Sequence, residues 1–456
     1  MGPIIIGHEH SLRLLHRFVS ADPTNRYPYV RMLDLSIPCL YACAEEGTSQ
    51  RIADIIQQST CLETLFLRYC DFLFSLPDFS KVVAAINALT SLRRIRFNMW
   101  NDQVTSIVRH MQSPIRRLEV GDISQVETDD DCIALSRLEP VVGPLAATIE
   151  ALHLPSVYLH PGSPFQFPRV RSLGIDRSAD RPSLDALLRM FPGLSGGSLS
   201  IACHVFVDGD PLNEDAEQTL VRSENRDQQV ERSWTHLDRL DADPIGLYML
   251  GLRCPVRVLN LRCSPCWTQE PHVVEVLRDT KPCCLRLSAW VSDTRSAFID
   301  SVPPEVAQRM THLSLNMALL APSAVSGRST HQDGFSITAL LGRVMHVLKS
   351  TRLTHLHVAI TTDPAAAKQL WTDFMLEIRV LDLNTWAAQF ACALPNLRFI
   401  AFTIDPYAAF MYTFARGWRV MRGGAAVPGA SSGGPVVELL DYYATRQVLR
   451  DEELVL

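Results

Sequence analysis

Arginine is the residue type whose placement in this chain of 456 residues suggests a binding chemistry. Six arginines recur at related places of successive segments, four in a first group and two further along: Arg68, Arg94, Arg96 and Arg117, then Arg262 and Arg286. A guanidinium is planar and donates two parallel hydrogen bonds to a carboxylate or a phosphate. The pattern therefore predicts a docking patch for an acidic or phosphorylated peptide. The alternative is a solvated surface on which Glu63, Asp71 and Glu119 balance the arginines.

One serine lies in a pattern that many hydrolases use for their nucleophile. The stretch Gly193-Leu194-Ser195-Gly196-Gly197 matches Gly-x-Ser-x-Gly, which presents a nucleophile only between a strand and the helix that follows it. Here a helical stretch comes first and the strand-like Leu199-Ser200-Ile201 comes afterwards. We therefore expect a turn between helix and strand, and no catalytic residue is predicted. A hydrolase that uses Ser195 is the alternative.

Four cysteines are close enough in the sequence to suggest a zinc site: Cys263, Cys266, Cys283 and Cys284. Structural zinc needs four ligands that reach one tetrahedron, whereas adjacent cysteines on a strand point to opposite faces. We expect these cysteines to be small apolar residues of the core instead.

Three histidines, His312, His355 and His357, fall on the strand-like segments of two successive repeats. Stacked parallel strands would bring His312 and His355 within about one strand spacing, roughly 4.8 Å. Such a pair suits a metal ion or a pH switch, and the alternative is solvated or hydrogen-bonded histidines. We expect the alternative, so that neither a metal nor a cofactor is predicted.

A short phrase of aliphatic residues recurs along the chain and sets the positions of all these side chains. An aliphatic residue is followed by two others, a second aliphatic, one other residue and a third aliphatic, as in Leu62-Glu63-Thr64-Leu65-Phe66-Leu67. The remaining full copies are Val30–Leu35, Leu92–Phe97, Ile115–Val120, Ile149–Leu154, Val170–Ile175, Val256–Leu261, Met310–Leu315, Leu353–Val358, Ile378–Leu383 and Leu397–Phe402. Weaker copies are Leu199–Ile201, Leu237–Ala242 and Leu285–Leu287. The copies lie about 28 residues apart on average, which is the spacing of leucine-rich repeats.

Each phrase predicts a strand, and the segments between phrases predict helices. The last two aliphatic places alternate with other residues, as in a strand with one buried face. Helical periodicity occupies Ser49–Gln58, Phe79–Leu89, Asp102–Met111, Ser183–Phe191, Val273–Leu277, Phe335–Leu348, Ala365–Leu376 and Trp386–Leu394. Alternating strands and helices imply parallel strands with right-handed crossovers. We therefore expect an α/β leucine-rich-repeat solenoid, a horseshoe with parallel strands on its concave face and helices on its convex face.

The residue between the two alternating aliphatics must point away from the core. In the copies with polar or aromatic residues at this place, these side chains would face a partner: Phe66, Arg96, His153, Asn260, Arg286 and His357. Aromatic and arginine side chains are the usual energetic anchors of protein interfaces. They join the other arginines as the predicted binding residues.

Interruptions of the repeat predict the domain organisation. Residues 1–29 are expected to form an N-terminal helical cap, and residues 30–422 an irregular solenoid. Loop insertions are expected near residues 208–233, which are polar and charged, and near residues 321–334, which are rich in Ser, Gly and Pro. Residues 423–456 are expected to form a flexible Gly/Ala/Ser loop and a C-terminal cap.

The composition limits the classes of partner. A net charge of -6 argues against broad affinity for nucleic acid, because phosphate binding needs a basic excess. No segment has the roughly 20 apolar residues of a membrane helix, and the apolar run at Ile4–Ile6 is too short for a secretory leader. Twelve scattered cysteines fit a reducing compartment, so that we expect a cytoplasmic or nuclear protein without nucleic-acid or membrane partners.

The repeat phrases resemble those of leucine-rich-repeat proteins and, more narrowly, of fungal F-box/leucine-rich-repeat-like proteins. The local likeness is carried by Leu14–Phe18 with Tyr29–Leu35, by Cys254–Leu261 and by Leu394–Ile400. The resemblance implies a non-enzymatic interaction protein, namely the substrate-recognition part of an SCF-type ubiquitin ligase receptor. Residues 1–29 would then be the remnant of a linker from F-box to repeats. The Leu-Pro-x-Glu start of an F-box is missing, so binding of the SCF adaptor would require an F-box upstream. The alternatives are a degenerate structural paralogue without a ubiquitin role and the hydrolase.

Overall fold

A computed structural model gives the fold. It describes residues 2–36, 47–68, 73–99, 101–121, 142–156, 163–178, 182–203, 211–263, 270–291, 302–319, 336–362, 377, 380–405, 414–422 and 434–455. The chain divides into two compact units. The first unit comprises residues 1–209 and 227–235, and the second unit comprises residues 210–226 and 236–456.

The first unit contains a sheet of parallel strands in sequence order. The strands are β1 (Ile4–Ile6), β2 (Met32–Ser36), β3 (Thr64–Arg68), β4 (Arg94–Phe97), β5 (Arg117–Val120), β6 (Ala151–Ser156), β7 (Ser172–Ser178) and β8 (Ser198–Cys203). The aliphatic places of the phrase are buried, since Leu65, Leu67, Ile95 and Phe97 are not exposed at all. Each buried aliphatic side chain contributes about 1.5–3 kcal/mol.

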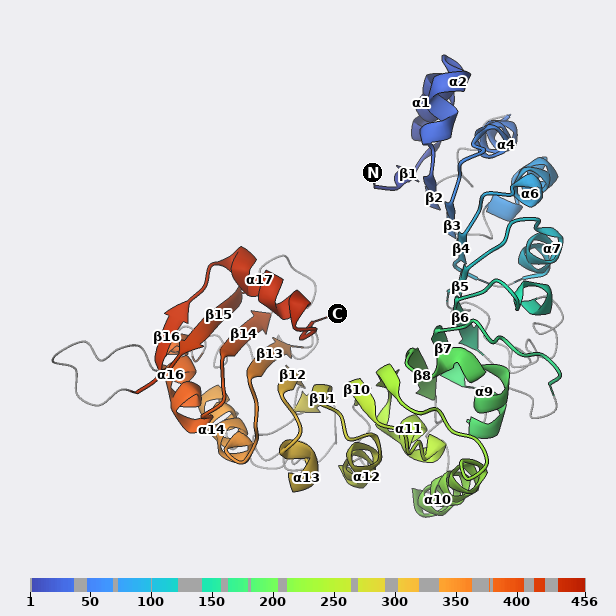
Figure 1. Cartoon of the computed structure of the whole chain (residues 1–456). Coiled ribbons are helices and arrows are strands. Elements are labelled where there is room, and N and C mark those ends of the chain that lie inside the picture. The colour runs from blue at the N-terminus through green and yellow to red at the C-terminus, as the bar shows by residue number, and fades with distance from the viewer. Residues whose placement is uncertain are drawn as a thin grey trace. The chain divides into compact units, whose positions relative to one another are not determined.

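Helices join the strands of the first unit. They are α1 (Glu9–Ser20), α2 (Pro23–Arg26), η1 (Tyr27–Tyr29), α4 (Thr48–Gln58), α6 (Phe79–Ala88), α7 (Asp102–His110), η3 (Gly143–Leu145), α9 (Leu184–Met190) and η4 (Pro192–Leu194). Figure 1 shows α4, α6 and α7 on one side of β2 to β5. Their inward residues, such as Ile52, Ile86 and Ile107, are fully buried or nearly so. The opposite face of these strands is therefore left for the intervening side chains.

The second unit also begins with parallel strands. β9 (Leu237–Ala242), β10 (Val256–Arg262), β11 (Cys284–Val291), β12 (His312–Leu319), β13 (His355–Thr362) and β14 (Phe399–Asp405) pair in that order. The last two strands, β15 (Phe414–Met421) and β16 (Val436–Leu439), are antiparallel to their neighbours. The fold is thus mixed α/β with mostly parallel strands, as predicted, and the antiparallel end was not foreseen.

Helices of the second unit lie on both faces of its strands. The connecting helices are α10 (Pro211–Gln228, up to Arg226 in this unit), α11 (Pro244–Leu250), α12 (Glu270–Thr280), α13 (Pro304–Ala307), α14 (Ile337–Leu348) and α16 (Leu383–Ala393). The last helix, α17 (Tyr442–Asp451), lies across the other face of β13 to β15 (Figure 1). Leu449 and Leu454 pack there against Phe399 and Ala401. We refer to residues 442–455 as the C-terminal segment.

The predicted strands and helices occur where the structure describes them, with one exception. The phrase Ile378–Leu383 is not a strand, because Val380 is helical and Leu383 begins α16. Its aliphatic spacing of three and two residues also fits one turn of helix, which the phrase alone does not distinguish. The strand β1 in residues 1–29 was not predicted either.

The charged segment near residues 208–233 is a helix rather than the predicted loop. Residues Pro211–Gln228 form α10, whose buried side chains include Gln218, Val221, Arg222 and Asn225. These positions have helical spacing, but their polar side chains hide the usual apolar pattern. Most of residues 321–334 and 423–434, and the predicted helix Ala365–Leu376, lie outside the described residues. No helix among the described residues is long and apolar enough to cross a membrane.

Candidate functional site

The strand face of the first unit carries four of the predicted arginines. Parallel pairing places Arg94 opposite Arg117, and Arg96 opposite Glu119. Arg68 lies at the end of β3, outside both pairs. The arginines thus lie on three neighbouring strands at three register positions, and they do not form a single column. They still gather because adjacent strands are only about 4.8 Å apart.

One carboxylate binds three of these arginines. Arg94 Nη2 donates a hydrogen bond of 2.7 Å to Glu119 Oε1, which also accepts from Arg117 Nε, and Arg96 Nε lies 3.8 Å from Oε2. Burial by itself would raise the pKa of the Glu119 carboxyl. The positive charges and hydrogen bonds of Arg117 and Arg94 outweigh burial and lower the pKa below its usual value. We call these four residues the Glu119 cluster.

The fourth arginine and a predicted aromatic residue border the cluster. Arg68 Nη2 lies 2.9 Å from Oδ2 of the buried Asp34. Phe66 is the register partner of Arg96, and the guanidinium carbon of Arg94 lies 5.0 Å from its ring centroid. A cation over an aromatic ring is attracted by the ring's quadrupole, so that Phe66 helps to position Arg94.

His153 borders the cluster on its other side. It is the register partner of Glu119 on β6 and is half-buried. Its ring lies over Gly174 of β7, where any Cβ would collide with His153 Nδ1. The glycine therefore makes room for the histidine on this face.

The arginines of this face remain accessible. Their side chains are between 32% and 51% exposed. Among the described residues of this face, four guanidiniums share the two carboxylates of Asp34 and Glu119, so a surplus of positive charge is left there. An exposed surplus of guanidinium forks suits a carboxylate or phosphate ligand.

The two arginines predicted for the second unit, Arg262 and Arg286, do not lie opposite each other on neighbouring strands. The register places Arg286 opposite Asn260, and Arg262 opposite Ser288. Arg262 Nε lies 2.8 Å from Asp241 Oδ1, and Asn260 Nδ2 donates to Asp241 Oδ2 at 2.8 Å. Arg262 and Asn260 are therefore occupied by one carboxylate, while Arg286 binds elsewhere.

The C-terminal segment covers Arg286. The guanidinium donates to the carbonyls of Glu453 at 2.6 Å and of Val455 at 3.0 Å, and the residue is only 5% exposed. Beside it, Arg257 donates to the side chains of Glu453 at 2.7 Å and Asp238 at 2.6 Å. Arg286 was predicted to face a partner, but it binds the chain's own last residues.

His357 is buried under the same segment. Nδ1 lies 2.9 Å from Ser314 Oγ, Nε2 lies 2.9 Å from Thr403 Oγ1, and the residue is 4% exposed. Burial lowers the pKa of the His357 imidazole to about 4. Neither His357 nor Arg286 is open to a partner while the C-terminal segment is in place.

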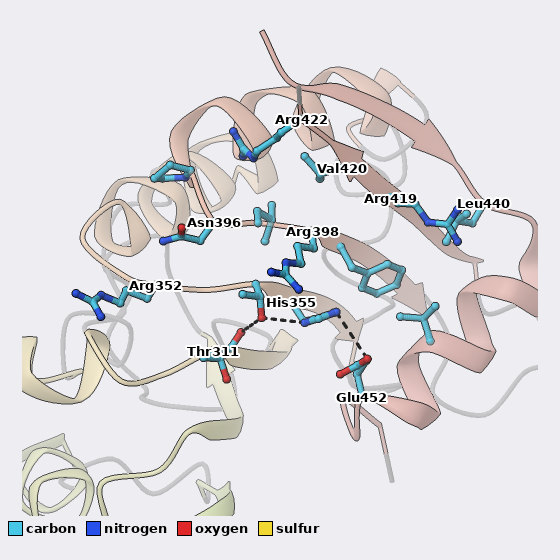
Figure 2. Close-up of a pocket in the computed structure, with 15 residues that line it drawn as sticks. Thr311, Arg352, His355, Asn396, Arg398, Arg419, Val420, Arg422, Leu440 and Glu452 are labelled. Carbon is cyan, nitrogen blue, oxygen red and sulfur yellow. Dashed lines mark hydrogen bonds and ion pairs between the residues drawn. The ribbon is translucent and has the colours of Figure 1, made fainter. Parts of the chain in front are cut away.

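A basic cavity of about 1120 Å³ lies beside the C-terminal segment (Figure 2). Its lining includes Arg352, Arg398 and Arg419, which are exposed, together with His355 and Glu452. His355 also has a pKa of about 4, because burial and the neighbouring His312 both disfavour its charged form. No sequence pattern marks this cavity, because its residues come from the ends of several strands and from the C-terminal segment.

The structure also places Ser195, the residue of the hydrolase alternative, and Cys263, one of the four cysteines considered for a zinc site. Ser195 lies in the turn between η4 and β8, as predicted, with its hydroxyl 2.7 Å from Thr235 Oγ1. The flanking Gly193 is needed because a Cβ there would collide with the carbonyl of Pro168. Cys263 is buried, and burial raises the pKa of its thiol to about 12, whereas Cys266 lies outside the described residues.

No family model matches the chain, and no curated protein gives a match. The class of the protein therefore follows from its own residues, as a mixed α/β protein of repeated strand–helix units with mostly parallel strands.

Proposed function

We propose that this chain is a non-enzymatic interaction protein of the leucine-rich-repeat type. In this proposal it is a solenoid with strands on its concave face, and it binds an acidic or phosphorylated segment of a partner protein on the strand face of the first unit. The observation that carries the proposal is the Glu119 cluster, in which three guanidiniums share one carboxylate.

Arg96 is the arginine of the cluster that is best placed for a ligand. Its closest approach to Glu119 is 3.8 Å, longer than a hydrogen bond, and its side chain is 47% exposed. Arg94 and Arg117 hold the carboxylate more closely. An incoming carboxylate or phosphate can therefore accept two parallel N–H bonds from Arg96 without breaking a short contact with another described residue.

The second unit is a weaker candidate for the same role. Its predicted residues Arg286 and His357 are covered by the C-terminal segment, and Arg262 and Asn260 share Asp241. We therefore place the ligand on the first unit.

The test compares charge reversal inside and outside the cluster. The double variant Arg94→Glu/Arg96→Glu should bind an acidic phosphoserine peptide pool at least about tenfold more weakly in fluorescence anisotropy, because two donors become repulsive. The matched control Arg31→Glu/Arg116→Glu reverses two exposed arginines that pair with Glu63 and Glu150. Equal binding by both double variants and the parent chain would refute the proposed docking surface.

The resemblance to F-box proteins adds a narrower proposal, that the chain recognises substrates for an SCF-type ubiquitin ligase. Affinity capture of the adaptor subunit with the full chain tests it, and the genomic reading frame upstream of Met1 shows whether an F-box precedes the repeats. A degenerate paralogue without a partner would capture neither the adaptor nor an acidic peptide.

A further inference from the structure

Two histidines and a glutamate from three elements meet on the strand face of the second unit. His312 begins β12, and its register partner His355 begins β13, with ring centroids 4.5 Å apart. Glu452 follows α17 directly. Its Oε2 lies 3.0 Å from His312 Nε2, and its Oε1 lies 3.9 Å from His355 Nε2. Figure 2 shows His355 and Glu452 facing each other.

The preceding threonines decide which ring nitrogens carry a proton. Thr311 Oγ1 donates to a backbone carbonyl at 3.3 Å, and Thr354 Oγ1 donates to another at 3.0 Å. Because a hydroxyl has one proton, each oxygen must accept from the histidine next to it, His312 Nδ1 at 2.8 Å or His355 Nδ1 at 3.0 Å. Each Nδ1 therefore carries hydrogen, and in the neutral imidazole the lone pair of each Nε2 lies on the side of Glu452.

Three electron-pair donors that face one another can share a cation, which is either a proton on an imidazole or a metal ion. Two neutral imidazoles and one carboxylate are the protein ligands of many zinc sites, and hydrogen-bonded Nδ1 atoms orient such histidines. Tetrahedral ligand atoms around Zn²⁺ lie about 3.3 Å apart, and the two His–Glu distances of 3.0 and 3.9 Å bracket that value. The rings are within 3° of parallel, so they must turn slightly toward each other to share an ion.

The surroundings give an ion access. His355 and Glu452 line the basic cavity of about 1120 Å³, which leaves a path for entry and room for a water molecule as fourth ligand. The three ligand residues are only half-buried, and two of them, His355 and Glu452, are in direct contact with that cavity.

We propose that His312, His355 and Glu452 bind one divalent transition-metal ion of the Zn²⁺ type, and that this ion holds the C-terminal segment on the strand face of the second unit. Two ligands come from strands and one from the segment, so the ion bridges them. Its loss releases one of the contacts that keep Arg286 covered.

The first test measures binding of Zn²⁺ to the full chain after removal of metal with a chelator. Isothermal titration should show one Zn²⁺ per chain, and His312→Ala and Glu452→Gln should each weaken this binding by roughly 100-fold or more. His346→Ala removes an exposed histidine of α14 in the same unit and should leave binding unchanged. Circular dichroism shows that each variant is folded.

The second test reads the position of the C-terminal segment. Zn²⁺ should slow tryptic cleavage after Arg446 and Arg450 at least about tenfold in the parent chain and not in His312→Ala. Equal Zn²⁺ binding by the parent chain and His312→Ala, or no saturable binding, would overturn the site, and the His312–Glu452 contact would then be an ion pair with a protonated imidazole. Tight binding without protection would overturn the bridging role.

Discussion

The contact between α17 and β15 offers a sharp test of how the C-terminal segment is held. An alanine Cβ at Gly417 would lie 2.8 Å from both Cγ2 and Oγ1 of Thr445, and 3.1 Å from Phe399 Cε2. Carbon atoms in contact prefer separations of about 3.5–4.0 Å. Thr445 is fully buried and cannot swing away, so Gly417→Ala should destabilise the chain by about 1–3 kcal/mol, the usual cost of overpacking.

The second arm of this prediction is the removal of the clash. Thr445→Ala deletes both clashing atoms, together with a buried hydroxyl that has no hydrogen-bond partner among the described residues. Alone it should change the free energy of unfolding by less than about 1 kcal/mol, because the lost methyl is offset by the removed polar group. The double variant Gly417→Ala/Thr445→Ala should therefore be more stable than Gly417→Ala, with a coupling energy of about 1–2 kcal/mol.

Urea unfolding and hydrogen exchange of the α17 amides measure this coupling. Gly342→Ala on α14 is the control, because its Cβ would meet only Trp386 Cη2 at 4.0 Å and alanine favours a helix. Additive free energies in the double variant, or a Gly417→Ala variant as stable as the parent chain, would show that the close approach does not hold the segment.

Three further predictions concern the rest of the fold. The pKa of the Glu119 carboxyl is lower in the folded chain than in the unfolded chain, where it is about 4.3. The carboxylate therefore contributes its full stability above about pH 4.3, and this contribution is lost as the pH falls through the folded pKa. Glu119→Gln should reduce the loss of unfolding free energy at acidic pH, as measured by urea unfolding at several pH values. Asp279→Asn leaves the buried Arg222 without its 2.5 Å partner and should cost about 3–5 kcal/mol, with faster hydrogen exchange in α10. Ser195→Ala should cost about 1 kcal/mol through its lost contact with Thr235, and a serine-directed probe should label neither the parent chain nor the variant.

The strand positions were predictable because the phrase recurs many times with the alternation of a buried strand face, although the copy at Ile378–Leu383 also fits a helical turn. The first aliphatic place is buried as well, as Leu62 and Leu92 show. The neighbouring positions of His312 and His355 followed from the same register. Local periodicity therefore determined the strands and the residues that face each other across them.

The remainder of the site depends on contacts that no local pattern contains. Glu452 lies 140 residues beyond His312, so the sequence gives no sign that they meet. The contact between Arg286 and Glu453 also joins residues that are far apart in the sequence, so no local pattern predicts it. The helix α10 was not predicted for another reason. Its buried residues Arg222 and Asn225 donate hydrogen bonds to backbone carbonyls, so the segment lacks the apolar periodicity that indicates a helix.

The pairing of Arg257 with Glu453 has a consequence for biosynthesis. The two residues are separated by 196 positions, so β10 emerges from the ribosome long before its acidic partner is made. At roughly 5–20 residues per second, about 10–40 seconds pass before the C-terminal segment can cover the strands. During that interval the nascent second unit presents Arg257 and Arg286 to solvent, and a chaperone or an early partner can reach side chains that the finished chain conceals.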